Sequence, residues 1–210
     1  MKNTTPRTTD IYVVGVGGTG SVTSARFLGE AATRAGCKVL VGEVHGMAQR
    51  GGIVESSVRI GEVYGPIIDD GGAEVLLGFE PVETLRALNK ATPATLIITN
   101  TYPIVPATVS MAGETYPEPE ETIRYLRTFA RRVLALDATA EAAAAGSTKA
   151  QGTVLLGVLA GAGALPFPAD MLREVILEGV PERVRGINED AFARGEAFAA
   201  ANAHVIEGGR

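Results

Sequence analysis

Hydrophobic positions in the first 60 residues form short strand-like runs separated by one helical stripe. Residues 11–16 are a continuous β-branched run, which is typical of a strand buried on both faces of a sheet. A glycine-rich turn follows, and apolar residues then recur at helical spacing from Val22 to Ala35. Residues 39–44 form a second apolar run. The pattern predicts a strand, a glycine loop, a helix and another strand.

The spacing before the third strand predicts a change of direction. Only residues 45–52 separate the second run from an alternating apolar segment at 53–60. About a dozen residues or more are needed for the crossover that joins two parallel strands. We therefore expect the third strand to run antiparallel to a neighbour, in a sheet that is mixed but mostly parallel.

Strand and helix patterns alternate again after residue 70, and the chain after residue 138 is alanine-rich and helical in pattern. We expect one domain, 1–210, with a three-layer Rossmann-like α/β core at 1–138 and a helical extension at 139–210 packed on it. The further predicted strands are 74–79, 95–100 and 133–137, and the further predicted helices are 81–90, 120–131, 139–145, 153–163, 169–178 and 182–202.

Composition removes several classes of function. The chain has 210 residues, 46% of them hydrophobic, and a net charge of −5, which argues against nucleic acid or an anionic membrane as partner. Its N-terminus is polar and its longest apolar stretch is too short to span a bilayer, so we expect a cytoplasmic protein. With Cys37 as its one cysteine and two histidines, the chain itself is not expected to bind a metal or a four-cysteine iron–sulfur cluster.

The glycine loop is the first candidate ligand site. Gly15, Gly17 and Gly20 have the spacing G-x-G-x-x-G after a predicted strand and before a predicted helix, where free backbone N–H groups can approach a phosphate. Glu43 ends the second predicted strand, near the position of a ribose-binding acid. A tight turn without a ligand is the alternative. The candidate ligand residues of the loop are Gly15, Gly17, Gly18, Thr19 and Gly20.

A second cluster, from Glu43 to Gly52, holds an acid, a histidine, an amide and an arginine between glycines. If the first two strands are parallel neighbours, both loops leave the same edge of the sheet, where α/β proteins bind ligands. Arg50 is suited to clamping an anionic group, and His45 to holding a proton or tying the loop to the backbone. Candidate catalytic residues are His45 and Arg50, and further candidate ligand residues are Glu43, Gln49, Arg50, Gly51, Gly52, Asn100 and Thr101.

Together these motifs resemble the gamma-type domain of 2-oxoacid:ferredoxin oxidoreductases. The resemblance covers nearly the whole chain, and the run from Glu43 to Gly52 is its specific part. Two positions depart from the family pattern: Thr19 stands where glutamine is frequent, and Gly152 where asparagine is frequent. The other matching segments are Gly78-Phe79-Glu80-Pro81, Asn100-Thr101-Tyr102-Pro103-Ile104, Ala135-Leu136-Asp137-Ala138-Thr139, Leu155-Leu156-Gly157 and Asn188-Glu189-Asp190-Ala191-Phe192.

The resemblance implies a subunit that is inactive alone and binds no cofactor by itself. A larger partner, with two copies of each subunit in the complex, would carry thiamine diphosphate, magnesium and 4Fe–4S clusters. Coenzyme A would accept the acyl group and ferredoxin the electrons. The single cysteine and the lack of a Gly-Asp-Gly stretch agree with this division. The loop from Glu43 to Gly52 is then expected to face the partner's cofactor.

The substrate is left open between several 2-oxoacids. The resemblance is to the branch that acts on indolepyruvate and other arylpyruvates. A gamma subunit for pyruvate, 2-oxoglutarate or branched-chain 2-oxoacids is the alternative within the family. A stand-alone Rossmann-like dinucleotide-binding protein is the alternative from another class.

Overall fold

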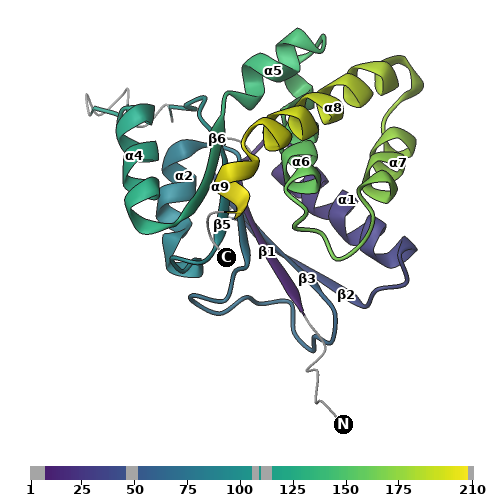
Figure 1. The fold of residues 1–210 in the computed structure, drawn as a ribbon, viewed down its shortest axis with the longest axis horizontal. Coiled ribbons are helices and arrows are strands. Elements are labelled where there is room, and N and C mark those ends of the chain that lie inside the picture. Colours follow the sequence, from purple (N-terminus) through teal and green to yellow (C-terminus); the bar gives the residue numbers. More distant parts are fainter. Residues whose placement is uncertain (1–7, 46–51, 106–108, 110–114, 208–210) are drawn as a thin grey trace.

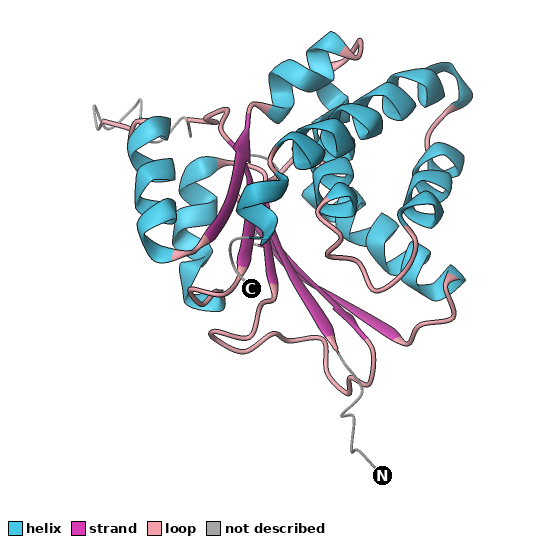
Figure 2. Cartoon of the chain, in the orientation of Figure 1, coloured by secondary structure: helices cyan, strands magenta, loops and turns pink. Residues whose placement is uncertain are grey.

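The computed structural model describes residues 8–45, 52–105, 109 and 115–207. In this part of the chain six strands form one sheet in the order β2-β3-β1-β4-β5-β6 (Figures 1 and 2). Strand β3 is antiparallel to both of its neighbours, whereas β1, β4, β5 and β6 are parallel. The predicted mixed, mostly parallel sheet is therefore confirmed. The strands are β1(Thr9–Val16), β2(Val39–His45), β3(Ile53–Ile60), β4(Val75–Gly78), β5(Leu96–Asn100) and β6(Arg132–Leu136).

The first two strands are not the parallel neighbours that were considered as a condition above. Strand β3 lies between β1 and β2, with Ile60 opposite both Thr9 and Val39. The short connection makes β2 and β3 a hairpin, which pairs with β1 through β3. Because β3 is antiparallel to both, β1 and β2 still point the same way. Their carboxyl ends therefore share an edge, although one strand separates them.

Helices cover both faces of the sheet (Figure 1). The α-helices are α1(Ser21–Arg34), α2(Pro81–Arg86), α4(Pro119–Phe129), α5(Ala138–Ala144), α6(Gln151–Gly161), α7(Ala169–Gly179), α8(Arg185–Ala201) and α9(Ala203–Glu207), with short 3-10 helices at Ala87–Lys90, Thr148–Ala150 and Glu182–Val184. The helix predicted at 81–90 is thus a short α-helix followed by a 3-10 turn. The helix predicted at 182–202 begins with a 3-10 turn and continues as α8.

Alternation along the strands divides the core into two layers. Ile11 and Val13 pack with α1, α6, α7 and α8, whereas Tyr12 and Val14 pack on the face that α2 and α4 cover. Neighbouring residues of a strand point to opposite faces, so one strand serves both layers. The helices after residue 138 share their core with α1. The predicted helical extension is therefore one of the two layers that enclose the sheet.

The apolar segment around residues 152–160 is a buried core helix, as predicted. All of these residues in α6 are buried, and α6 packs closely on α8. A Cβ atom on Gly157 would collide with the backbone of Phe192, and one on Gly195 with the carbonyl oxygen of Val154. The two helices therefore meet backbone to backbone. Within the described residues, no helix is long and apolar enough to cross a membrane.

Candidate active-site crevice

The chain turns to opposite faces of the sheet after two adjacent strands. Helix α1 follows β1 onto one face, and α2 follows β4 onto the other. Open α/β sheets bind ligands outside the carboxyl ends of the strands at such a switch point. The glycine loop after β1 and the Phe79-Glu80 turn after β4 border this crevice. The fold therefore places the predicted glycine loop where a ligand is expected.

The glycines of the loop have separate structural reasons. Gly18 and Gly20 have φ values of 96° and 94°, which favour glycine, and open space surrounds both. A Cβ atom on Gly15 would come 2.8 Å from the Cβ of Phe79, so β1 has no room for a side chain there. The Thr19 hydroxyl donates to the carbonyl oxygen of Val16 at 2.8 Å. Thr19 thus closes the turn.

The two predicted loops meet at one backbone hydrogen bond. The N–H of Gly17 donates to the carbonyl oxygen of Gly52 at 2.8 Å. Gln49, Arg50 and Gly51 lie outside the described residues. His45 ends β2 with its backbone opposite Val54, and its side chain is also outside what is described. The structure therefore brings Gly52, of the second cluster, to the glycine loop.

Glu43 lies farther from the crevice than the sequence suggested. Its side chain is exposed, and its backbone is opposite Ser56 of β3. A ribose-binding acid in a dinucleotide fold ends the strand next to β1. Here β3 occupies that place, which moves Glu43 one more strand spacing away, about 4.8 Å. The dinucleotide interpretation loses its main support.

Asn100 is fully buried and ties three strand ends together. Its amide nitrogen lies 3.4 Å from the carbonyl oxygen of Phe79 and 3.1 Å from the Thr139 hydroxyl. Its side-chain oxygen accepts from the N–H groups of Tyr102 and Ala138 at 3.2 and 2.9 Å. These bonds use the polar capacity of the side chain within the fold. Thr101 beside it is half-buried, and its role toward a ligand stays a prediction.

Gln151 is a site residue that the sequence reasoning missed. Its side-chain nitrogen donates to the carbonyl oxygen of Thr19 at 3.1 Å, and its oxygen accepts from the Thr139 hydroxyl at 2.8 Å. The same oxygen lies 3.3 Å from the Asn100 amide nitrogen. Gln151, the first residue of α6, thus holds the glycine loop through a hydrogen bond to the backbone of Thr19. The one sequence signal that pointed towards Gln151 was its hydrogen-bond partner Thr139, which lies in a segment that resembles the family.

Two buried carboxyl groups lie at the start of α2, just after β4. Glu80 is fully buried at the start of α2, where it accepts from the Glu83 N–H at 2.9 Å and from the Tyr116 hydroxyl at 2.7 Å. Glu83 is 5% exposed, and its Oε2 atom has no hydrogen-bond partner. Burial raises the pKa of Glu83, and the nearby Glu80 and Glu55 raise it further against Arg86. Burial and the two neighbouring carboxylates therefore work against the charged form of Glu83.

A pocket of about 500 Å³ opens beside the glycine loop and the first turn of α1. Lys149 and Arg183 line it and are both exposed, so two cations face a helix N-terminus. Such a terminus offers free N–H groups and a positive dipole end, and together these groups suit an anionic ligand. The other lining residues are Gly20, Thr23, Ser24, Phe27, Ser147, Ala150, Gly152, Thr153, Val180, Val184, Ile187 and Asn188.

Gly152 lies in the wall of this pocket, where α6 packs closely on α1 and on Phe79. A Cβ atom at Gly152 would come 2.8 Å from the hydroxyl of Ser24 and 3.2 Å from the ring of Phe79. The asparagine that is frequent here in the family would therefore need these neighbours to move. At this position the chain therefore has close packing of α6 against α1 in place of an amide.

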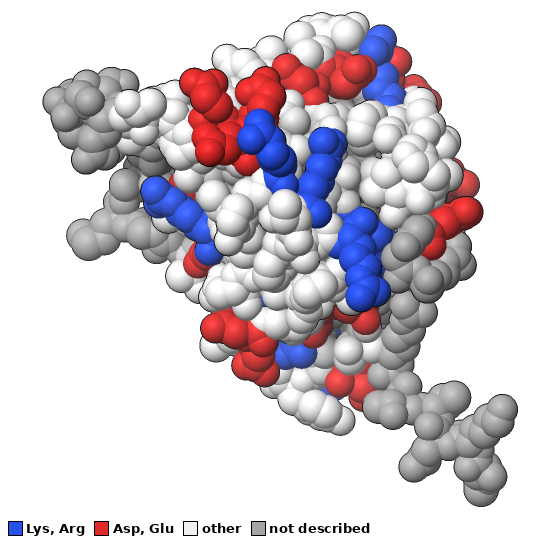
Figure 3. Space-filling model, turned by 60° about the vertical axis from the view of Figure 1, so that its left-hand side comes forward, with Lys and Arg blue, Asp and Glu red and all other residues white. Residues whose placement is uncertain are grey.

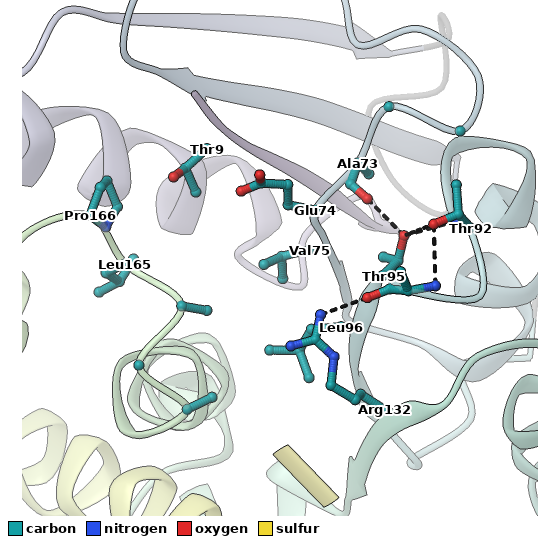
Figure 4. Close-up of a pocket in the computed structure, with 16 residues that line it drawn as sticks. Thr9, Ala73, Glu74, Val75, Thr92, Thr95, Leu96, Arg132, Leu165 and Pro166 are labelled. Atoms are coloured by element: carbon teal, nitrogen blue, oxygen red, sulfur yellow. Dashed lines mark hydrogen bonds between the residues drawn. The ribbon is translucent and has the colours of Figure 1, made fainter. Parts of the chain in front are cut away.

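A second pocket of about 500 Å³ lies at the opposite end of the parallel strands, where they begin (Figure 4). It adjoins the first residues of β1, β4, β5 and β6. The polar groups labelled there hold the fold together, since the Thr95 hydroxyl donates to the carbonyl oxygen of Ala73 at 2.7 Å and Arg132 donates to that of Ala94 at 2.6 Å. Among the described residues, no group of three or more His, Cys, Asp or Glu could hold a metal ion.

Comparison with solved structures supports this fold. The chain is similar to a keto/oxoacid ferredoxin oxidoreductase gamma subunit from Geobacter sulfurreducens, with a TM-score of 0.66 and 19% identity over 92% of this chain and 99% of that one. It is also similar to a 2-oxoglutarate:ferredoxin oxidoreductase from Magnetococcus marinus, with a TM-score of 0.70 and 23% identity over 93% of this chain and 31% of that one.

Sequence comparison shows the family. A relative from Pyrococcus horikoshii named indolepyruvate oxidoreductase subunit IorB is 44% identical over 89% of this chain and 93% of its own. The subunit of the same name from Archaeoglobus fulgidus is 41% identical over 89% and 92%. The family model described as pyruvate ferredoxin/flavodoxin oxidoreductase matches residues 10–198. These matches confirm the predicted resemblance, and the chain belongs to the pyruvate ferredoxin/flavodoxin oxidoreductase family.

Proposed function

We propose that this chain is the non-redox subunit of an enzyme that oxidatively decarboxylates indolepyruvate or another arylpyruvate. The products are carbon dioxide, the acyl-CoA and reduced ferredoxin. Support for the substrate comes from relatives at 41–44% identity that are named indolepyruvate oxidoreductase subunits.

A larger partner subunit would hold thiamine diphosphate, magnesium and the 4Fe–4S clusters. A 4Fe–4S cluster takes four cysteine thiolates, and this chain has one cysteine. When bound to the partner, thiamine diphosphate would stabilise the electron pair that remains on the substrate after carbon dioxide leaves. The clusters would transfer these electrons one at a time. The residues of this chain are left with binding, orientation and exclusion of water.

The observation that carries this role is the cationic pocket beside the glycine loop. Coenzyme A bears phosphate groups, and Lys149, Arg183 and the first turn of α1 are suited to holding them. The Magnetococcus marinus enzyme of the same fold was solved with coenzyme A bound. We infer that the pocket takes the phosphate-bearing part of coenzyme A, while His45 and Arg50 face the cofactor of the partner.

The test uses the two-subunit enzyme, prepared by co-expression with the larger subunit. Lys149→Ala and Arg183→Ala should each raise the KM for coenzyme A about tenfold, the effect of one charge-assisted contact. The KM for indolepyruvate should stay unchanged. Lys38→Ala, at the opposite edge of the sheet, is the matched control.

Two outcomes would contradict the proposal. An unchanged KM for coenzyme A in both variants would remove the pocket from its binding. Indolepyruvate oxidation by this chain without a partner, or cluster absorbance in the purified chain, would overturn the division of labour itself.

A further inference from the structure

Strand β6 has a free side. It pairs with β5, and no other described strand pairs with it. The N–H of Thr101 donates to the carbonyl oxygen of Leu136 at 2.9 Å, so the backbone of Leu136 faces β5. Backbone groups alternate in direction along a strand. The N–H and C=O groups of Val133 and Ala135 therefore point away from the sheet.

These outward groups lie at the bottom of a groove of about 470 Å³. One wall comes from the end of α4 and the turn after it, and the other from α8 and α9. The groove thus follows the sheet edge between the two helical layers. Among the described residues, no hydrogen bond reaches the outward groups of Val133 and Ala135. The lining residues are Arg127, Ala130, Arg131, Val133, Leu134, Ala135, Phe198, Asn202, His204 and Val205.

The groove is basic, although the chain is acidic overall. Arg127 and Arg131 line one wall, both are exposed, and neither has an ion-pair partner among the described residues. Arg124 is exposed one turn earlier on α4, and His204 lies on the opposite wall. On the side of the molecule that carries α4, both Lys or Arg and Asp or Glu side chains border a largely uncharged area (Figure 3). Arg131 lies in the turn beyond the end of α4.

We propose that the groove binds an extended segment with acidic side chains from the larger subunit, which adds to the sheet as a strand beside β6. Backbone hydrogen bonds to Val133 and Ala135 supply the attachment. Acidic side chains near Arg127 and Arg131 fix its position along the strand. A second copy of this chain fits poorly, because its own β6 lies recessed between the same helices.

The first experiment follows amide hydrogen exchange in residues 131–137, in the chain alone and in the purified two-subunit complex. The amides that face β5 should exchange slowly in both states. Two further amides, those of Val133 and Ala135, should become slow only in the complex. Arg127→Glu with Arg131→Glu should weaken assembly about tenfold or more at low salt, and less at high salt. Arg26→Glu on α1 should leave assembly unchanged.

Each other outcome overturns a specific part of the inference, which rests on the proposed partnership with a larger subunit. Failure to form any complex would overturn that partnership as well. A complex in which Val133 and Ala135 exchange as fast as in the free chain would overturn the groove alone. Slow exchange at both residues in the free chain, together with a dimeric mass, would assign the edge to a second copy. If Arg26→Glu weakened assembly as much as the double variant does, the charges of Arg127 and Arg131 would have no specific role in binding the partner.

Discussion

The backbone N–H of Gly17 lies 2.8 Å from the carbonyl oxygen of Gly52 and donates to it. This bond joins the turn after β1 to the residue before β3. The two glycine-rich loops are therefore parts of one edge, because β3, which follows the second loop, pairs directly with β1. A change in one loop should be transmitted to the other through this contact.

Arg50 in the second loop should matter for turnover and little for folding. Arg50→Lys keeps the charge but loses the planar fork that binds an anion through two hydrogen bonds. We expect a loss of about 2–3 kcal/mol in the affected step, or roughly a hundredfold in turnover by the two-subunit enzyme. The assay is indolepyruvate-dependent reduction of an electron acceptor. Unchanged kinetics, or a collapse of the Tm of the chain alone, would make the loop merely structural.

Asn100→Asp should destabilise the chain strongly. The amide nitrogen of Asn100 faces the oxygens of Phe79, Thr139 and Gln151, and a carboxylate there would bring a buried charge against them. The expected loss is about 2–3 kcal/mol of unfolding free energy, measured by urea denaturation. Asn202→Asp, at the end of α8, provides the comparison and should cost less than about 1 kcal/mol. Equal losses of unfolding free energy in the two variants would mean that the buried hydrogen bonds of Asn100 do not stabilise the fold more than an exposed one does.

Glu83 should make the stability of the chain depend on pH. Its folded-state pKa is raised by burial above the ordinary value of 4.5, with Glu80 and Glu55 adding to the rise and Arg86 opposing it. The unfolded chain therefore releases this proton first, and stability falls as pH rises from 4.5 through the folded-state pKa.

Glu83→Gln removes that charge, so the variant should be more stable than the natural chain at pH 8 and close to it at pH 4.5. Urea denaturation at the two pH values measures the difference. A variant that loses stability more at pH 8 than at pH 4.5 would show that the ion pair with Arg86, whose Nη1 atom lies 3.9 Å from Glu83 Oε1, outweighs burial, and would contradict the predicted sign.

The contact between α6 and α8 should tolerate no side chain. Gly195→Ala places a methyl group against the backbone of Val154 and Val158, which should cost about 3 kcal/mol or more. The Tm should then fall by roughly 6–12 °C for a chain of this size. Gly186→Ala in the same helix meets open space, so its Tm should be unchanged or slightly raised. Thermal unfolding of both variants checks this, and a similar Tm for the two would exclude a tight contact.

Local pattern was enough to predict most elements but not their pairing. The β-branched run at 11–16 and the short connection at 45–52 correctly predicted a buried strand and an antiparallel one. Which strand lies next to β1 depends on contacts between distant segments, and periodicity carries no information about those. The same limit hid Gln151, because a glutamine at the start of an apolar helix shows no relation to a loop 132 residues earlier.

The candidate site was predicted in part. Gly18 and Gly20 lie in the predicted glycine loop and have positive φ values, and Asp137 caps α5, accepting from the Ala140 N–H at 2.8 Å. Glu80 and Tyr116 were not singled out as a pair, because a buried carboxyl bonded to a tyrosine 36 residues away leaves no local pattern. The contribution of Gln49, Arg50 and Gly51 stays a prediction.

The layer formed by α6, α7 and α8 has a consequence for how the chain is made. One face of the sheet, including Ile11 and Val13, is covered largely by helices that leave the ribosome last. Until then that apolar face is bare, and Gln151 is not yet in place beneath the glycine loop. The first 138 residues should therefore stay exposed to aggregation and to chaperones during synthesis, and the site should form only after nearly the whole chain has emerged.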